Sequence, residues 1–226
     1  MTEKNSFSIN YQELLTALGA RAVSDAPSEG ELSFTAVCTD NREAVKNSIF
    51  FARTGEQTDG HRFIEAAVSS GATACIVSDS WANSADAKTL INKMPDTVFL
   101  AVKDTTIAFG DLARWWRQQL NVPVIAITGS NGKTTTKEMV RHALEQLVGA
   151  GTANEKSFNN HVGLPATILK ASRSDKWLLL EAGMNHAGEL RYLASIAKPS
   201  VAAVLNVGPV HLEYFSSLSV IADAKC

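Results

Sequence analysis

The sequence VIAITGSNGKTTTKEMV, at residues 124–140, places an apolar run directly before two glycines, a lysine and three threonines. Glycines that turn backbone N–H groups inward at the start of a helix make a preformed anion site. In such a loop the lysine supplies charge to the β- and γ-phosphates, and the first threonine places its hydroxyl on Mg²⁺. The pattern predicts an ATP and Mg²⁺ site at Gly129, Ser130, Asn131, Gly132, Lys133, Thr134 and Thr135.

This loop matches a short form of the phosphate-loop motif, TGSNGKTT, because Ile127 stands where the strict pattern has another glycine. The alternative interpretation is an ordinary strand-to-helix turn whose glycines serve geometry alone. An apolar strand, GK and tandem threonines in the order strand, loop, helix favour the phosphate site.

Two further polar residues come after apolar runs, Glu181 in LLLEAGMNHAGEL and His211 in NVGPVHLEYF. A carboxylate is an oxygen ligand for Mg²⁺, and His211 is a candidate for the same ion or a second one. Taken singly, Glu181 is equally a helix N-terminal charge and His211 a packed or solvated residue. Ligands of open α/β sheets bind at the carboxyl ends of strands, so we expect both residues to face the phosphate loop.

The remaining histidines and the cysteines carry no comparable signal. His142, His161 and His186 are interpreted as structural. The three cysteines, Cys38, Cys75 and Cys226, lie far apart without metal-ligand spacing, and we assign them no chemistry.

Composition bounds the class of protein. The chain has 226 residues, 45% hydrophobic and 19% charged, which is typical of a soluble globular protein of two domains. A net charge of -2 gives no overall bias toward nucleic acid. No leader-like apolar segment and no run near ~20 apolar residues is present, so we expect a cytoplasmic protein without a membrane span, and a monomer.

The first part of the chain reads as a small α/β domain. A helix is expected at residues 10–20, ending near Gly19, and a second at residues 61–72, ending at Gly71. Its apolar face is formed by Phe63, Ile64, Ala67 and Val68. Strands are expected at residues 34–40, 48–52, 73–78 and 97–102, and residues 78–96 read as a surface connection with one short helix.

From residue 104 the pattern changes to a long amphipathic helix, with Ala108, Leu112, Trp115, Trp116 and Leu120 near helical spacing. We place a domain boundary before it. Continuous apolar strands at residues 122–128, 177–183 and 200–208, alternating with helices, predict a parallel sheet covered on both faces. The fold class is therefore α/β, a small N-terminal domain followed by a phosphate-loop, parallel-sheet domain.

Four segments occur in the order found in Mur ligases: TGSNGKTTTKEM, KSFNNHVGLPATIL, LEAGMNHAGELRYLASIAKP and NVGPVHLEYFSSLSVIADAKC. The chain resembles this family, most of all the type that adds D-Ala-D-Ala to UDP-N-acetylmuramoyl-tripeptide (UDP-MurNAc-tripeptide). The form E-x-G-M-N-x-x-G-E around Glu181 is the most specific pointer. Residues 39–72 are similar to the family's UDP-sugar-binding domain, although Asn41 stands where the family usually has Ser or Thr.

The resemblance implies an ATP-dependent ligase of the cytoplasmic peptidoglycan precursor pathway. The tripeptide carboxylate would attack the γ-phosphate to give an acyl phosphate, which D-Ala-D-Ala then displaces. Lys133, Glu181, His211 and Lys225 would form the catalytic centre, with Thr134, Glu181, His211 and a carbamylated Lys225 at Mg²⁺. Lys225 is expected to be a free, solvated amine in this chain, where it stands one residue from the end.

The family also implies the substrate contacts. UDP-MurNAc-tripeptide would be bound by Thr39, Asp40, Asn41, Arg42, Asp59, His61, Asn159 and Asn160. For Arg42 the equally weighted alternative is a surface salt bridge to Asp40 or Glu43. For Asn159 and Asn160 the alternative is that they are ordinary polar residues of a loop before a helix.

A complete ligase of this family has a third, Rossmann-like domain. We therefore expect residues 1–103 to bind the UDP-sugar, residues 104–226 to be an incomplete ATP-binding domain, and the C-terminal domain to be absent. Alternatives are a simple ATPase or nucleotide switch, a non-catalytic substrate-binding module, and a folylpolyglutamate synthase-like enzyme.

Overall fold

The computed structural model describes residues 6–24, 32–55, 58–210, 214 and 217–225 of the chain. They divide into two compact units, Phe7–Leu112 and a second unit that begins at Ala113. The division lies inside helix α5 (Thr105–Gln119), whereas the sequence analysis put the boundary before this helix. One continuous helix therefore contributes residues to both units.

The first unit is built on a five-stranded sheet of order β2-β7-β6-β5-β4. Strands β4 to β7 run parallel, and β2 is antiparallel to β7. Every residue of β5 and β7 is buried, as expected for uninterrupted apolar strands covered on both faces. The strands are β2 (Arg21–Ala22), β4 (Ala36–Cys38), β5 (Ser48–Phe51), β6 (Ala72–Ser78) and β7 (Val98–Val102), with a separate antiparallel pair, β1 (Ile9–Asn10) and β3 (Ser33–Phe34).

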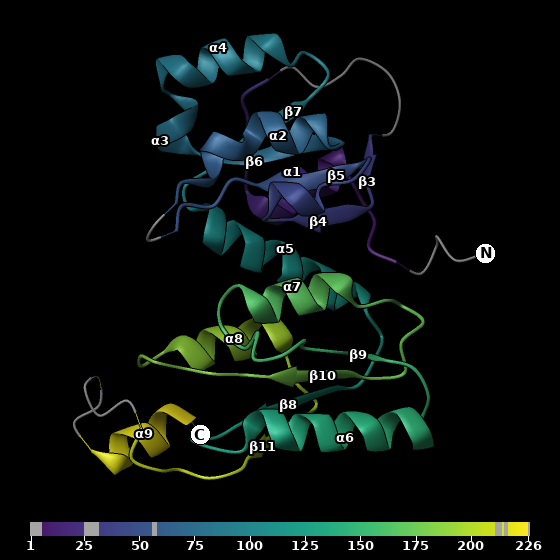
Figure 1. Cartoon of the computed structure of the whole chain (residues 1–226), viewed down its shortest axis with the longest axis vertical. Helices are drawn as coiled ribbons and strands as arrows, with labels where there is room; N and C mark the ends of the chain where they lie inside the picture. Colours follow the sequence, from purple (N-terminus) through teal and green to yellow (C-terminus); the bar gives the residue numbers. More distant parts are fainter. Residues whose placement is uncertain (1–5, 25–31, 56–57, 211–213, 215–216, 226) are drawn as a thin grey trace. The chain divides into compact units, whose positions relative to one another are not determined.

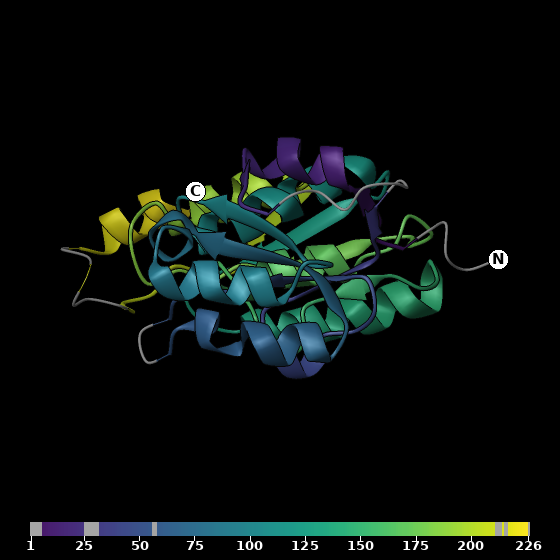
Figure 2. The same cartoon turned by 90° about the horizontal axis from the view of Figure 1, so that it is seen from above.

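Helices cover both faces of this sheet. Figure 2 shows α1 (Tyr11–Leu18) on the face opposite α2 (Ile64–Ser69) and α4 (Ala85–Lys93). The predicted helix at α1 is confirmed: Asn10 and Glu13 form a capping box, and Gly19 ends the helix with φ 55°. The remaining short helices are η2 (Asn41–Glu43), η3 (Gly60–Phe63) and α3 (Asp79–Ala82).

Three details of the first unit differ from the sequence analysis. The strand expected at residues 34–40 is divided between β3, which pairs with β1, and β4, which pairs with β5. Residues 78–96 contain two helices, α3 and α4, because Ser78 and Ser84 each cap a new helix start. Phe63 is 39% exposed and is not part of the buried face of α2 formed by Ile64 and Ala67, since it is the last residue of the 3₁₀ turn η3.

The second unit has a parallel sheet of order β11-β8-β10-β9. Its strands are β8 (Val124–Thr128), β9 (Thr152–Ala153), β10 (Leu178–Glu181) and β11 (Val201–Val204). Glu181 pairs with Ile127, and Val204 pairs with Thr128. The carboxyl ends of three strands therefore meet at one edge, which confirms the predicted parallel α/β architecture.

Figure 1 shows α6 (Lys133–Leu147) on one side of this sheet and α7 (Gly163–Lys170) with α8 (Glu189–Ala197) on the other. Helix α9 (Leu218–Lys225) packs through Ile221 against Met184. The side chains of Trp116 and Trp177 are 0% and 1% exposed and are packing residues of this unit.

Candidate nucleotide and substrate site

The loop between β8 and α6 requires its two glycines. Gly129 has φ 151°, and an added Cβ would lie 3.1 Å from Cβ of Leu205. Gly132 has φ 81° and is the N-cap residue of α6. Both φ values lie where a side chain is strained, so the sequence folds here into a tight turn that opens onto a helix.

Helix α6 begins without a side-chain cap. The first N–H groups of a helix lack intrahelical partners, and with the helix dipole they favour a bound anion. Two N–H groups of the preceding loop are already used: those of Ser130 and Asn131 donate to the carbonyl (3.1 Å) and Oδ1 (3.0 Å) of Asn206. Ser130 and Asn131 thus brace the loop through their backbone, and the open donors are those of the helix start.

Lys133 and Thr134 extend from the first turn of α6. The Lys133 ammonium donates to the carbonyls of Gly129 (2.8 Å) and Ser130 (3.4 Å), so it lies over the loop. The Thr134 hydroxyl donates to Oε2 of Glu181 over 3.0 Å. The structure therefore brings together the loop and the strand-end carboxylate that the sequence analysis assigned to one site.

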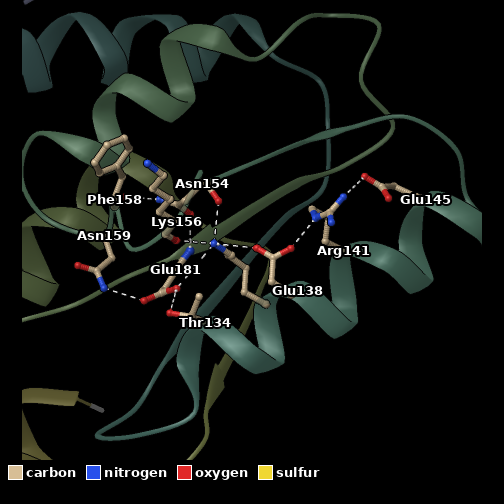
Figure 3. A network of polar contacts seen from close by, with 10 residues as sticks. Thr134, Glu138, Arg141, Glu145, Asn154, Lys156, Phe158, Asn159 and Glu181 are labelled. Carbon is tan, nitrogen blue, oxygen red and sulfur yellow. Dashed lines mark hydrogen bonds and ion pairs between the residues drawn. The ribbon is translucent and has the colours of Figure 1, made fainter.

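Glu181 is 1% exposed and is held on several sides (Figure 3). Its backbone N–H donates to Oδ1 of Asn154 (2.6 Å), and its Oε1 accepts from Nδ2 of Asn159 (2.7 Å). The ammonium of Lys137 lies 3.9 Å from Oε2. These contacts fix both oxygens of the carboxylate toward the start of α6.

Sequence reasoning missed Lys137 and Asn154, which are 0% and 2% exposed. Lys137 follows Thr134 by three residues, so both lie on one face of α6. That spacing was visible in the sequence, but a lysine within a helix is ordinarily a solvated residue. Asn154 follows the two-residue strand β9, which carries too few residues to be recognised from a pattern.

The donors in place suit a hard cation. A threonine hydroxyl and a carboxylate 3.0 Å apart, beside an uncapped helix start, are the oxygen ligands that Mg²⁺ takes next to nucleotide phosphates. No cluster of three or more His, Cys, Asp and Glu residues occurs within the residues that the structure describes. The predicted ligand His211 lies outside the described residues.

Lys225 is the last residue of α9 and is 8% exposed. Burial, and secondly the charge of Lys133, lower the pKa of its amine below the ordinary value. The expectation of a solvated lysine at a frayed end is therefore wrong, because α9 packs against the unit through Ile221 and stays helical to Lys225. Lys225 lines a cavity of about 330 Å³ with Thr128, Arg191 and Asp223.

Asn159 and Asn160 play different parts. Asn159 contacts Glu181, and its neighbour Gly183 has no room for a side chain, since a Cβ there would lie 2.7 Å from Oδ1 of Asn159. Asn160 instead accepts from the N–H groups of Val162 (3.1 Å) and Gly163 (2.9 Å), the residue before α7 and the first residue of α7. The loop alternative thus describes the contacts of Asn160, and its predicted substrate contact stays a prediction.

The predicted uridine loop of the first unit follows β4, at Thr39, Asp40, Asn41 and Arg42. Asp40 caps η2 through the N–H of Arg42 (2.9 Å), and the Arg42 guanidinium donates back to its carboxylate through Nε (2.9 Å). These hydrogen bonds lower the pKa of Asp40 to about 2. The Arg42 side chain is 83% exposed, so the salt-bridge alternative is present and the guanidinium also remains open to solvent.

Asp59, His61 and Ser78 form a second polar cluster. The His61 ring lies 2.5 Å from Asp59 through Nδ1, and its Nε2 accepts from the N–H of Ser78 (3.0 Å). The ring is 6% exposed and stacks on Trp81 at 5.1 Å. Burial raises the pKa of the Asp59 carboxyl, but the hydrogen bonds from His61 outweigh this, so the pKa lies below its ordinary value. Both ring nitrogens are engaged, so His61 ties the loop to β6, and its predicted substrate contact stays a prediction.

Comparison with known families accounts for these two sites together. Residues 33–117 match the model described as "Mur ligase family, catalytic domain", and residues 127–226 match the "Mur ligase middle domain". The chain belongs to the Mur ligase family. Of the segments that carried the resemblance, the phosphate loop, Glu181 and the asparagine loop converge in space within the part matched to the middle domain.

Several Mur ligases are similar over most of this chain. The UDP-N-acetylmuramoyl-tripeptide--D-alanyl-D-alanine ligases of Haemophilus influenzae and Escherichia coli are each 38% identical, over 83% and 86% of the chain. A crystal structure of MurF from Acinetobacter baumannii covers 97% of the chain with a TM-score of 0.83 and 32% identity. MurF of Thermotoga maritima in complex with ADP covers 84% with a TM-score of 0.70 and 30% identity.

The chain spans only part of these relatives: 39% and 40% of the two curated ligases, and 46% and 42% of the two structures. Among the helices of the described residues, none has the length and apolar composition needed to cross a membrane.

Proposed function

We propose that this chain carries the UDP-substrate and ATP sites of a ligase that joins D-Ala-D-Ala to UDP-MurNAc-tripeptide. The observation that carries the proposal is the contact between Thr134 and Glu181 at the uncapped start of α6. It joins the phosphate loop to the E-x-G-M-N-x-x-G-E segment in a chain 38% identical to ligases named for this reaction.

The proposed chemistry follows from charge. The tripeptide carboxylate and the triphosphate are both anionic, so cations and N–H donors must stabilise the charge that spreads over the γ-phosphate. Lys133 and the first N–H groups of α6 would supply this charge and these donors. An oxygen of the carboxylate displaces ADP and forms an acyl phosphate. The amine of D-Ala-D-Ala then attacks the acyl carbon, a C–N bond forms, phosphate leaves, and the amine loses a proton.

Mg²⁺ would neutralise phosphate charge and orient the transferred group. Thr134 and Glu181 would hold it. We keep His211 and a carbamylated Lys225 as proposed further ligands. A carbamate requires a neutral amine, and the burial of Lys225 beside Lys133 favours that form. A ¹³C signal from lysine carbamate, obtained with ¹³C-bicarbonate and lost in Lys225→Met, would support this ligand; its absence from a complete, active enzyme would remove it.

The first unit would bind the uridine diphosphate through Thr39, Asp40, Asn41 and Arg42 and the loop around Asp59, while Asn159 faces the peptide end. Arg42 has the exposure and the fork of donors that bidentate phosphate binding needs. Asn41 carries a longer carboxamide side chain in place of the hydroxyl of Ser or Thr that the family usually has.

Calorimetry with two ligands tests the proposal. We expect the 226-residue chain to bind Mg-ADP and UDP-MurNAc-tripeptide, and to bind UDP more weakly than the tripeptide-bearing ligand. The same titrations with Lys133→Ala and Glu181→Ala should lose nucleotide binding selectively. The proposal would be refuted if the unsubstituted chain bound neither Mg-ADP nor UDP-MurNAc-tripeptide.

A non-catalytic module that binds the UDP-linked substrate and ATP remains the second candidate for residues 1–226. Phosphate release from ATP, measured with UDP-MurNAc-tripeptide and with or without D-Ala-D-Ala, separates the candidates. We expect residues 1–226 alone to bind without ligation. Nucleotide hydrolysis that ignores the UDP-linked substrate would instead indicate a simple ATPase.

A further inference from the structure

Lys137 is a buried charge that the proposed chemistry does not use. Its side chain is 0% exposed on the sheet-facing side of α6. Removing an ammonium from water costs several kcal/mol unless partners replace the water, and an apolar side chain would fill the same space without that cost. The contacts of Lys137 therefore indicate what the charge is for.

The ammonium of Lys137 contacts two backbone carbonyls of an irregular segment. Its Nζ donates to the carbonyls of Asn154 (2.7 Å) and Lys156 (2.6 Å) and forms an ion pair with Glu138 (3.2 Å). An ammonium has three N–H groups, and these three partners match them. Glu181 lies just beyond, 3.9 Å away.

The segment held in this way is strained. Lys156 has φ 50°, a left-handed conformation that is unfavourable for a residue with a side chain and persists only where the surroundings impose it. Its carbonyl is one of the two that point at Lys137. The hydrogen bonds from Lys137 therefore stabilise a turn that residues 154–159 would not adopt by themselves.

The turn controls two functional groups. Asn154 binds the backbone N–H of Glu181 through Oδ1 and the Phe158 carbonyl through Nδ2. Asn159, at the end of the turn, donates to the Glu181 carboxylate and accepts from the N–H of Gly183 (2.8 Å). A change in the turn would therefore move Asn159 and release Glu181 together.

We propose that Lys137 is a positioning residue, whose buried ammonium holds the strained turn at Asn154 and Lys156 and thereby places Asn159, which is bonded to Glu181, for the peptide end of the UDP-linked substrate. This inference rests on the proposed function, because that function supplies the substrate. It predicts that Lys137 sets the preference for UDP-MurNAc-tripeptide over UDP without contacting either ligand.

The first test is the ratio of the two dissociation constants, for UDP and for UDP-MurNAc-tripeptide, measured by calorimetry on the 226-residue chain. Lys137→Met should lower this preference about tenfold, the size typical for losing a residue that orients a ligand-binding group. The affinity for UDP itself should stay within about twofold, since UDP contacts are assigned to the first unit. An unchanged preference in folded Lys137→Met would overturn the inference.

A second substitution tests the mechanism through strain. Glycine adopts positive φ without penalty, so Lys156→Gly should restore part of the preference lost in Lys137→Met. A double variant that is no better than Lys137→Met alone would contradict the role of the turn. Arg141→Met is the matched control: it removes a cation of α6 that pairs with Glu138 and Glu145, and it should leave the preference unchanged.

A measurement on the unsubstituted chain guards against variants that fail to fold. The ammonium ¹H–¹⁵N signal of Lys137 should shift when UDP-MurNAc-tripeptide is added and stay in place when UDP is added. A signal unmoved by the tripeptide ligand overturns the inference. If the unsubstituted chain has no preference for the tripeptide ligand at all, the proposed function fails as well, which separates that result from a failure of Lys137 alone.

Discussion

Lys133 is the residue whose charge stands closest to the proposed phosphate transfer. It is held over the loop by the carbonyl of Gly129 at 2.8 Å. Removing one preorganised charge costs about 3 kcal/mol of transition-state stabilisation, or roughly a hundredfold in rate. We expect Lys133→Ala, introduced into an active ligase that contains this sequence, to lower the rate of single-turnover phosphate release by at least about a hundredfold. Lys170→Ala, which removes an exposed partner of Glu155, is the control; equal rates in both variants would exclude Lys133 from the reaction.

Arg42 distinguishes phosphate binding from a surface ion pair. The pKa of Asp40, lowered to about 2 by its hydrogen bonds with Arg42, keeps the pair ionised at ordinary pH. Arg42→Lys preserves the charge but loses the planar fork, so UDP affinity should fall about tenfold if the guanidinium grips phosphate. The free energy of unfolding should change by less than about 1 kcal/mol, since exposed ion pairs contribute little. Calorimetry measures the UDP affinity, and urea unfolding measures the free energy of unfolding. An unaltered UDP affinity would show that Arg42 forms the ion pair with Asp40 and does not bind phosphate.

Lys225 predicts a dependence of stability on pH. Its pKa is lowered in the folded chain, first by burial and then by Lys133, so the unfolded state binds more protons in the window below the ordinary lysine pKa. Stability therefore rises as pH increases through that window. We expect the midpoint of urea unfolding, followed from pH 7 to 10, to rise less in Lys225→Met than in the unsubstituted chain. Parallel curves for the two proteins would contradict this.

For single residues, the sequence was sufficient to predict a site position where a suitable residue type directly follows a predicted strand. Thr134 and Glu181 were predicted to face one crevice, and their side chains are in contact. Lys137 and Asn154 were not foreseen, because their roles come from backbone carbonyls and N–H groups that only the folded turn brings near. Every residue has a backbone carbonyl, so residue type alone does not show which backbone groups a side chain will contact.

Among the elements, α7 offers a test of the Asn160 assignment. Its carboxamide oxygen accepts from the N–H groups at the start of this helix. Asn160→Ala should reduce the free energy of unfolding by about 1 kcal/mol, as for other helix N-terminal acceptors, while Asn160→Asp keeps the acceptor and the stability. Denaturant unfolding gives the stability, and tripeptide-ligand affinity is measured beside it. If both variants weaken ligand binding equally at unchanged stability, Asn160 is a substrate contact rather than a cap.

The longer elements were predictable and the shortest were not. Strands such as β7 and β8 carry continuous apolar runs, and α1 has its capping residues and terminal glycine in the sequence. Strand β9 has two residues and exists because it pairs with β10, so its cause lies outside its own sequence. Phe63 was misplaced for a related reason: a 3₁₀ turn before α2 shifts the helical register, and periodicity alone does not reveal it.

For the molecule as a whole, β11 is the outer strand of its sheet in the described chain, and it is uncharged. Val201 is 57% exposed there. An open apolar edge is a template for pairing between molecules, most of all near the isoelectric point, about 6.2 for this chain. We expect Val201→Lys to reduce association near that pH in light scattering. Met139→Lys, on exposed α6 surface, should have less effect; equal effects would point to net charge instead of the edge.

The division of the chain shows the limit of pattern reading at this scale. A change from strands to an amphipathic helix predicts a domain boundary before residue 104. The structure divides inside α5, between Leu112 and Ala113. The first half of the helix packs Phe109 on Phe51, and the second half buries Trp116, whose indole N–H donates to Ala171. The residues that each turn of a helix contacts depend on the tertiary fold.

The stacking of Trp81 on His61 has an optical consequence. Trp81 is in the first unit, whereas Trp115, Trp116 and Trp177 all follow residue 112. Replacing those three with phenylalanine would leave Trp81 as the single tryptophan, stacked on the imidazole that ties the Asp59 loop to β6. Its fluorescence would then report on that loop alone, so that uridine nucleotide binding could be followed in a cuvette without any label, separately from events at the phosphate loop.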